Sequence, residues 1–71
     1  MTAPQALQIL VNGNARTTLA ANIEELAREL SPAPARLLIE HNGRALLRSE
    51  WPAAPLAPGD RIEVLQVSAG G

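Results

Sequence analysis

Cysteine, lysine, tyrosine and phenylalanine are absent from this sequence of 71 residues, and Trp51 is its one aromatic residue. Without cysteine the chain has no disulfide, no thiolate nucleophile and no cysteine ligand for a metal ion. A single ring cannot build the stacking surface on which nucleic acid bases or sugars bind. Because lysine is missing, the chain has no side-chain amine on which isopeptide-linked polymers of itself could grow.

Charge is sparse as well. The formal net charge is −1, and the six arginines are spread along the chain. They form no basic stripe of the kind that neutralises phosphates, so nucleic acid is not an expected partner.

Long apolar runs are missing too. No stretch approaches the ~20 apolar residues that cross a bilayer, and residues 1–5 lack the basic flank of a secretion signal. We therefore expect no membrane association and a cytoplasmic location. A chain this short also leaves little room for a deep substrate cavity, so we expect no enzymatic activity of its own, no catalytic residues and no bound cofactor.

The start of the chain predicts a β-hairpin. In residues 7–11, Leu7, Ile9 and Val11 recur at every second position, which places them on one face of a strand. Asn12-Gly13 follows as a strong tight-turn signal, so a second strand should return over about residues 15–19.

A helix should follow the hairpin. From Ile23 onward, apolar residues recur at the i, i+3, i+4 and i+7 spacing of an amphipathic helix. Asn22 and Glu25 form a capping-box pattern at its start, in which each side chain accepts a hydrogen bond from a backbone N–H of the first turn. Pro32 cannot continue the helix and should end it at Ser31.

The second half predicts three more strands. Residues 36–41 and 45–47 flank another Asn-Gly turn, residues 49–56 look irregular, and residues 57–60 have the Pro-Gly centre of a type II turn. Residues 61–67 form the last strand, which is either a central strand with apolar residues on both faces or a bulged one. One helical stripe can cover one face of one sheet, which predicts a two-layer α+β domain over residues 1–71.

The chain closes with Ser68-Ala69-Gly70-Gly71. We expect residues 68–71 to be a flexible arm that leaves the sheet and spans ~13 Å, at about 3.4 Å per residue. Glycine has no β-carbon, so the arm could thread into a narrow tunnel of a partner. The carboxylate of Gly71, ionised at neutral pH, could attack the α-phosphorus of ATP and become an acyl adenylate. A partner would have to bind the ATP and the magnesium ion.

These features together resemble the ThiS family of the ubiquitin-like β-grasp superfamily. The resemblance covers nearly the whole chain, and its most specific part is the ending. It is carried by residues 8–13, Glu25-Leu26, Asn42-Gly43-Arg44, residues 48–51 and residues 58–71. It implies a β-grasp fold, a single mixed sheet of about five strands with one helix packed across it.

The resemblance also implies a function in thiamin thiazole biosynthesis. A ThiF-like enzyme would adenylate Gly71, and sulfur from a cysteine desulfurase or sulfurtransferase would convert it to a thiocarboxylate. A ThiG-like thiazole synthase would then take up the sulfur. Ser68, Ala69 and Gly70 would thread into the partner.

Three alternatives stay open at this point. The chain could be a MoaD-like sulfur carrier for molybdopterin synthesis, a ubiquitin-like modifier that joins Gly71 to a lysine of a target, or a β-grasp interaction module with an inert tail. The residues around 48–51 and 66–69 resemble ThiS more than MoaD.

The remaining polar and aromatic residues have structural interpretations. We expect His41 to be a solvated turn residue and Trp51 to cover the core edge with its indole N–H near water. Glu40, Glu50 and Glu63 should be solvated rather than hold a metal ion. The sheet face opposite the helix is the expected partner surface, and alternate residues of the last strand should contribute to it.

Overall fold

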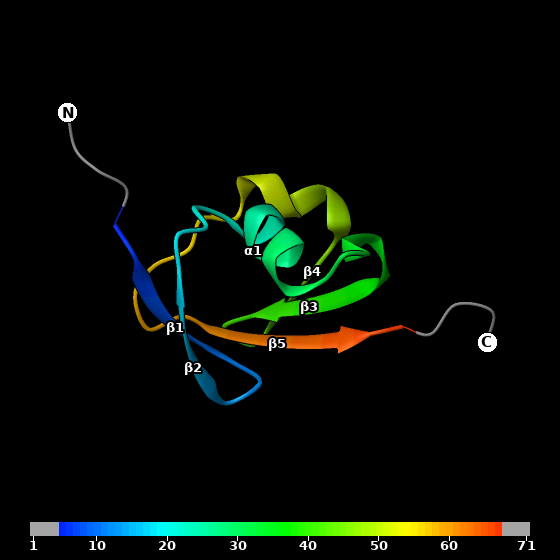
Figure 1. Cartoon of the computed structure of the whole chain (residues 1–71). Coiled ribbons are helices and arrows are strands. Elements are labelled where there is room, and N and C mark those ends of the chain that lie inside the picture. The colour runs from blue at the N-terminus through cyan, green and yellow to red at the C-terminus, as the bar shows by residue number, and fades with distance from the viewer. Residues whose placement is uncertain (1–4, 68–71) are drawn as a thin grey trace.

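The computed structural model describes residues 5–67, which form one five-stranded sheet with a helix across one face (Figure 1). Neighbouring strands follow the order β2-β1-β5-β3-β4. The sheet is mixed, because β1 and β5 are parallel and the other neighbours are antiparallel. This arrangement confirms the expected α+β fold of the β-grasp type. The elements are β1 (Leu7–Val11), β2 (Asn14–Thr18), α1 (Ile23–Leu30), η1 (Pro34–Arg36), β3 (Leu37–His41), β4 (Arg44–Leu46), η2 (Arg48–Ala53) and β5 (Arg61–Gln66).

Both hairpins turn at the predicted Asn-Gly pairs. Asn12 and Asn42 each have a φ of 51°, and the glycines after them have φ values of 81° and 85°. Positive φ at both central positions is what a two-residue hairpin of type I′ requires, and asparagine and glycine tolerate it best. The return strand β2 begins one residue earlier than predicted.

Helix α1 begins at the predicted cap. The backbone N–H of Glu25 donates to Asn22 Oδ1 at 2.9 Å. The carboxylate of Glu25, however, accepts from the N–H of Ala21 at 2.9 Å, one residue before the expected donor. Glu25 therefore stabilises the entry to the helix rather than closing the capping box. The helix ends at Leu30, and Ser31 is its C-cap, as predicted.

The core lies between α1 and the sheet, and Trp51 is inside it. Its residue surface is only 2% exposed, and its indole Nε1 is buried with no hydrogen-bond partner in residues 5–67. The prediction that Trp51 covers the core edge with its N–H near water is therefore wrong. In a small domain without other aromatics, the largest side chain fills the core. The core residues are Ile9, Ala20, Ile23, Leu26, Ala27, Leu37, Ile39, Trp51 and Ile62.

A short 3₁₀ helix, η2, carries Trp51 into the core, where the sequence predicted irregular structure. The carboxylate of Glu50 accepts a hydrogen bond from the N–H of Leu47 at 2.7 Å and so stabilises the start of η2. The guanidinium of Arg48 lies 5.1 Å from the centroid of the Trp51 ring, within cation–π range.

Strand β5 occupies the centre of the sheet. It pairs with β3 over residues 62–66 in a register without a gap, so the predicted central strand is confirmed and the bulge is not present. Adjacent Val64 and Leu65 point to opposite faces because side chains alternate along a strand. The N–H of Val67 still donates to the carbonyl of Arg36 at 2.8 Å.

Two predictions stay as they were. Residues 1–4 and 68–71 lie outside the described residues, so the single domain over residues 1–71 and its flexible tail remain predictions.

Across residues 5–67, none of the helices has the length and apolar character to span a membrane.

Candidate functional site

The predicted site residues Ser68, Ala69, Gly70 and Gly71 lie outside the described residues. The structure does describe the strand that leads to them, the contacts that hold this strand, and the sheet face that it crosses. Those three features define the surroundings of β5, the last described strand before the tail.

Asn12 holds β5 from the side of β1. Its Oδ1 accepts the N–H of Val64 at 2.7 Å, and its Nδ2 donates to the carbonyl of Val64 at 3.1 Å. The side-chain amide thus makes the pair of hydrogen bonds that a strand backbone would make. It extends the parallel pairing of β1 and β5, which otherwise ends at Val11 and Ile62.

Asn42 and Asp60 hold the start of β5 from the side of β3. Asn42 Oδ1 accepts the N–H of Arg61 at 2.8 Å, and Asn42 Nδ2 donates to Asp60 Oδ1 at 3.1 Å. His41 Nε2 lies 2.7 Å from Asp60 Oδ2, which also accepts the N–H of Ala57 at 2.9 Å. The prediction that His41 is a solvated turn residue is therefore wrong.

These contacts determine the charge of Asp60. Burial by itself would raise the pKa of its carboxyl group. The hydrogen bonds from His41, from the N–H of Ala57 and from Asn42 outweigh burial and hold the pKa of Asp60 below its ordinary value. The carboxylate of Asp60 is therefore ionised at neutral pH, and it stabilises the start of β5 by accepting these hydrogen bonds.

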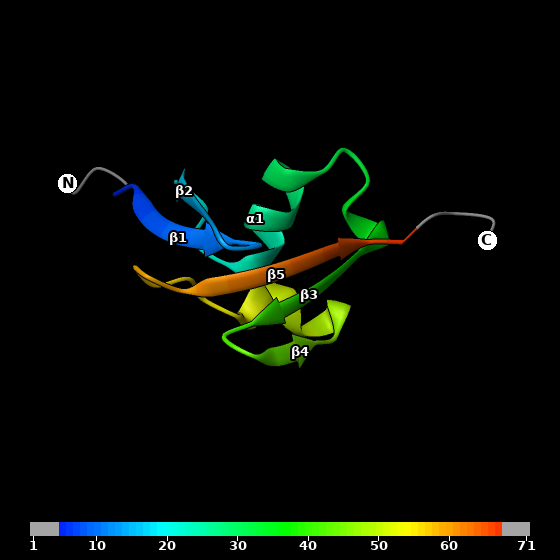
Figure 2. The same cartoon turned by 90° about the horizontal axis from the view of Figure 1, so that it is seen from below.

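The sheet face opposite α1 is open among the described elements. Figure 2 looks onto this face, where β5 crosses the centre between β1 and β3 while α1 lies behind the sheet. Leu38 of β3 and Leu65 of β5 are direct cross-strand partners on it, and they are 58% and 64% exposed. Apolar side chains that lie exposed next to each other are a feature of interaction surfaces.

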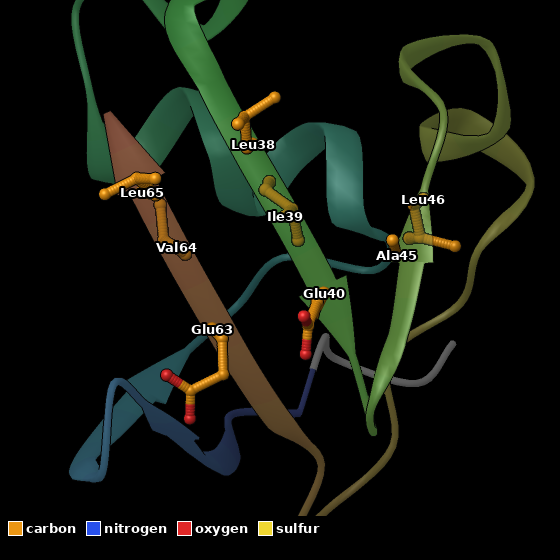
Figure 3. Close-up of a pocket in the computed structure, with 8 residues that line it drawn as sticks. All are labelled: Leu38, Ile39, Glu40, Ala45, Leu46, Glu63, Val64 and Leu65. Atoms are coloured by element: carbon orange, nitrogen blue, oxygen red, sulfur yellow. The ribbon is translucent and has the colours of Figure 1, made fainter. Parts of the chain in front are cut away.

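A shallow hollow of about 490 Å³ lies on the open face over β3, β4 and β5. Figure 3 shows the leucine pair at one end and Glu40 beside Glu63 at the other. Glu40 and Glu63 are also direct cross-strand partners, and each lies two residues from the leucine of its own strand. The open face thus has an apolar half and an acidic half.

A second hollow of about 520 Å³ lies between the β3–β4 hairpin and η2. Its charged side chains already have partners, because Arg44 Nη2 lies 2.9 Å from Glu50 Oε2 and His41 contacts Asp60. Within residues 5–67, no three histidine or acidic side chains come together as a metal site. We therefore place the candidate site on the open face and the strand that crosses it.

The sequence predicted the open face and the contribution of alternate residues of β5, but not the cross-strand pairs that distinguish this face. The alternation of β5 shows that Glu63 and Leu65 share a face, and the alternation of β3 does the same for Leu38 and Glu40. The register that places like residues opposite one another joins strands more than twenty residues apart, so no local pattern reveals it.

Comparisons with known proteins agree with this architecture. The sequence profile of the ThiS family matches residues 9–71. The crystal structure of the thiamine biosynthesis protein (ThiS) from Geobacter metallireducens is similar, with 33% sequence identity and a TM-score of 0.73. The match covers 92% of this chain and 100% of that one. Among curated proteins, no sequence matches the chain significantly.

Proposed function

This chain belongs to the ThiS family, and from that premise we propose that it is a sulfur carrier in thiamin thiazole biosynthesis that works through the carboxylate of Gly71. The observation that carries the proposal is the family match, which runs from β1 to the last glycine. The full-length similarity to a thiamine biosynthesis protein supports it.

The proposed chemistry takes place at one carboxylate. An oxygen of the Gly71 carboxylate attacks the α-phosphorus of ATP held by a ThiF-like enzyme, and pyrophosphate leaves. A carboxylate is a poor acyl donor because its charge is delocalised, and the acyl adenylate overcomes this. Sulfur from a cysteine desulfurase or sulfurtransferase then displaces AMP. Where that donor is a persulfide, a thiol supplies the two electrons that release the thiocarboxylate.

This chain contributes position rather than catalysis. We propose that residues 68–70 thread into the partner, with no β-carbon at Gly70 to meet the walls of a narrow tunnel. Pairing of β5 with β3, continued by the bond from Val67 to Arg36, defines the direction in which the chain leaves the sheet. The ThiF-like enzyme and a ThiG-like thiazole synthase would each receive the same tail.

Intact-mass analysis of the chain isolated from its own cells tests the proposal. We expect a fraction in which one terminal oxygen is replaced by sulfur, with a larger fraction under thiamin starvation. An adduct on a lysine of another protein would indicate a modifier instead. Accumulation of the thiolated chain when the sulfur-accepting step of molybdopterin synthesis is blocked, but not when that of thiazole synthesis is blocked, would indicate a MoaD-like carrier. An unmodified tail under starvation would contradict the proposal.

Two variants test the tail directly in a purified reaction with the ThiF-like enzyme, ATP and magnesium. We expect Gly70→Val, or one residue added after Gly71, to abolish release of pyrophosphate while leaving the fold intact. Ala53→Val is the matched control, because it enlarges an exposed residue of η2 far along the chain from the tail. Adenylation of the extended chain at its new end would contradict the narrow-tunnel argument.

A further inference from the structure

The seven carboxylate side chains of the sequence all lie within residues 5–67, where their surroundings are described. Five of them contact a positive group or a hydrogen-bond donor. Glu40 and Glu63 have no such partner among the described residues. The five contacts are Glu24 with Arg28, Glu25 with the N–H of Ala21, Glu29 with Arg16 and Thr18, Glu50 with Arg44 and the N–H of Leu47, and Asp60 with His41, Asn42 and the N–H of Ala57.

The two carboxylates without partners lie directly opposite each other. Glu40 of β3 pairs with Glu63 of β5 in the antiparallel register, and both are exposed on the open face. Residues in direct cross-strand positions have β-carbons about 4.5–5.5 Å apart, and like charges there destabilise a sheet. The isolated chain therefore contains an unfavourable contact that a positive group between the two carboxylates would relieve.

The neighbours of this pair indicate what kind of positive group fits. Leu38 and Leu65 lie next to it on the same two strands and line the same hollow. A hydrated cation would leave the leucines exposed to water, whereas a protein surface could cover them while a basic side chain reaches the glutamates. Arg61 shares this face of β5 but forms no ion pair with either glutamate.

The position of the pair indicates that this surface belongs to a protein that takes up the tail. Glu63 and Leu65 lie on β5, the strand that leads through Val67 into the tail. A partner that takes up residues 68–71 approaches the molecule beyond the end of β5, where Leu65 is nearer to it than Glu63. The same partner can therefore reach the open face.

We infer that the enzyme that activates the tail docks on the open face by inserting one arginine or lysine side chain between Glu40 and Glu63, while its apolar side chains cover Leu38 and Leu65. This inference rests on the proposed function for the identity of the partner. It assigns a recognition role to a charge pair that weakens the free domain. Removing either charge should therefore stabilise the free chain and weaken the complex, an opposite pair of effects that a purely structural role would not produce.

Calorimetric titration of the chain into the purified ThiF-like enzyme tests the docking. We expect Glu40→Gln and Glu63→Gln each to raise Kd about tenfold, and the double variant about 100-fold, because each leaves the basic side chain less compensated. Raising the salt concentration should weaken the wild-type complex more than that of the double variant. Glu24→Gln is the matched control. It removes the same charge from α1 on the other side of the sheet and should change Kd less than twofold.

Each outcome decides the inference. Unchanged Kd in the double variant, an equal loss in Glu24→Gln, or no binding of the wild-type chain would overturn it. Adenylation of Gly71 at saturating enzyme separates this failure from failure of the proposed function. If the variants bind like the wild type and are adenylated, only the docking inference falls. If the variants bind weakly but the wild type is not adenylated, the docking inference holds and the proposed function fails.

Discussion

The two faces of the sheet differ in how completely their side chains are used by the fold. On the covered face, Ile9, Ile39 and Ile62 are 3% exposed or less and pack against α1 and η2. On the open face, Leu38 and Leu65 are more than half exposed. Alternate residues of the same strands supply both faces, so one stretch of sequence provides an apolar face that α1 and η2 cover and an open face that also carries charge.

The same contrast holds for charge. Asp60 at the start of β5 has three hydrogen-bond donors around its carboxylate, whereas Glu63 on the open face of the same strand has none among residues 5–67. The carboxylate of Asp60 is held by donors of the fold, whereas that of Glu63 faces solvent and is free to bind a partner. The comparison shows that one segment of the chain can stabilise the fold through some of its side chains and leave others exposed for a partner.

The largest expected effect is on the free energy of unfolding, which a substitution on the covered face should lower far more than one on the open face. Ile62→Ala should destabilise the domain by about 2–5 kcal/mol, because it removes a fully buried side chain from the core. Leu65→Ala, three residues along, should cost less than about 1 kcal/mol because its side chain is already exposed. Urea unfolding followed by the fluorescence of Trp51 measures both.

A graded variant keeps this test informative if Ile62→Ala fails to fold. Ile62→Val should cost about 0.5–1.5 kcal/mol. The comparison between faces fails if Leu65→Ala destabilises the domain as much as Ile62→Ala does. Leu65→Ala should instead weaken the complex with the activating enzyme.

The next effect sharpens the comparison of charges. Asp60→Asn should destabilise the domain at pH 7 by about 1–3 kcal/mol, because His41 and the N–H of Ala57 lose a charged acceptor. The pKa of Asp60 is lowered from 3.8 in the native state. Its stabilising charge is therefore fully present above the unfolded pKa and is lost as pH falls through the lower native pKa.

Unfolding free energies of the wild type and Asp60→Asn, measured from pH 7 down to pH 3, check this sign. The difference between them should narrow at the acidic end of the series. Glu24→Gln is the control, because its exposed ion pair with Arg28 should contribute little at any pH. A constant difference across the series would show that the charge of Asp60 does not stabilise the fold.

Local patterns were sufficient to predict most of the fold. Alternation identified β1, the two Asn-Gly pairs identified both hairpin turns, and the cap at Asn22 identified the start of α1. Each of these signals depends on residues within a few positions of one another. The alternation of β5 left two interpretations open, a central strand or a bulged one, and the sheet order and the register with β3 show the central strand.

The errors came from contacts between distant segments. Pro52 and its alanine neighbours indicated irregular structure over residues 49–56, yet packing of Trp51 into the core stabilises a 3₁₀ helix there. The partner of His41 lies nineteen residues away, at Asp60. The pairing of Glu40 with Glu63 depends on the register of β3 and β5, which the tertiary structure sets.

The smallest expected effect is the most specific to the open face. Glu63→Gln should stabilise the free domain by about 0.2–1 kcal/mol, the size of a direct cross-strand charge interaction. Glu40→Gln should give the same gain, because either substitution removes the one repulsion between them. The double variant should therefore gain no more than a single one, since two neighbouring sites that share an interaction are not additive.

Urea unfolding at low and high salt measures these gains, and salt should reduce them because both carboxylates are exposed. If the stability gain of the double variant equals the sum of the two single gains, each glutamate is repelled by the other negative charges of the protein and not by its cross-strand partner. A loss of stability in either single variant would mean that the carboxylate has a favourable contact in the free chain. The gain, set beside weaker docking in the same variants, would show that the open face retains a contact that is unfavourable for folding and favourable for recognition.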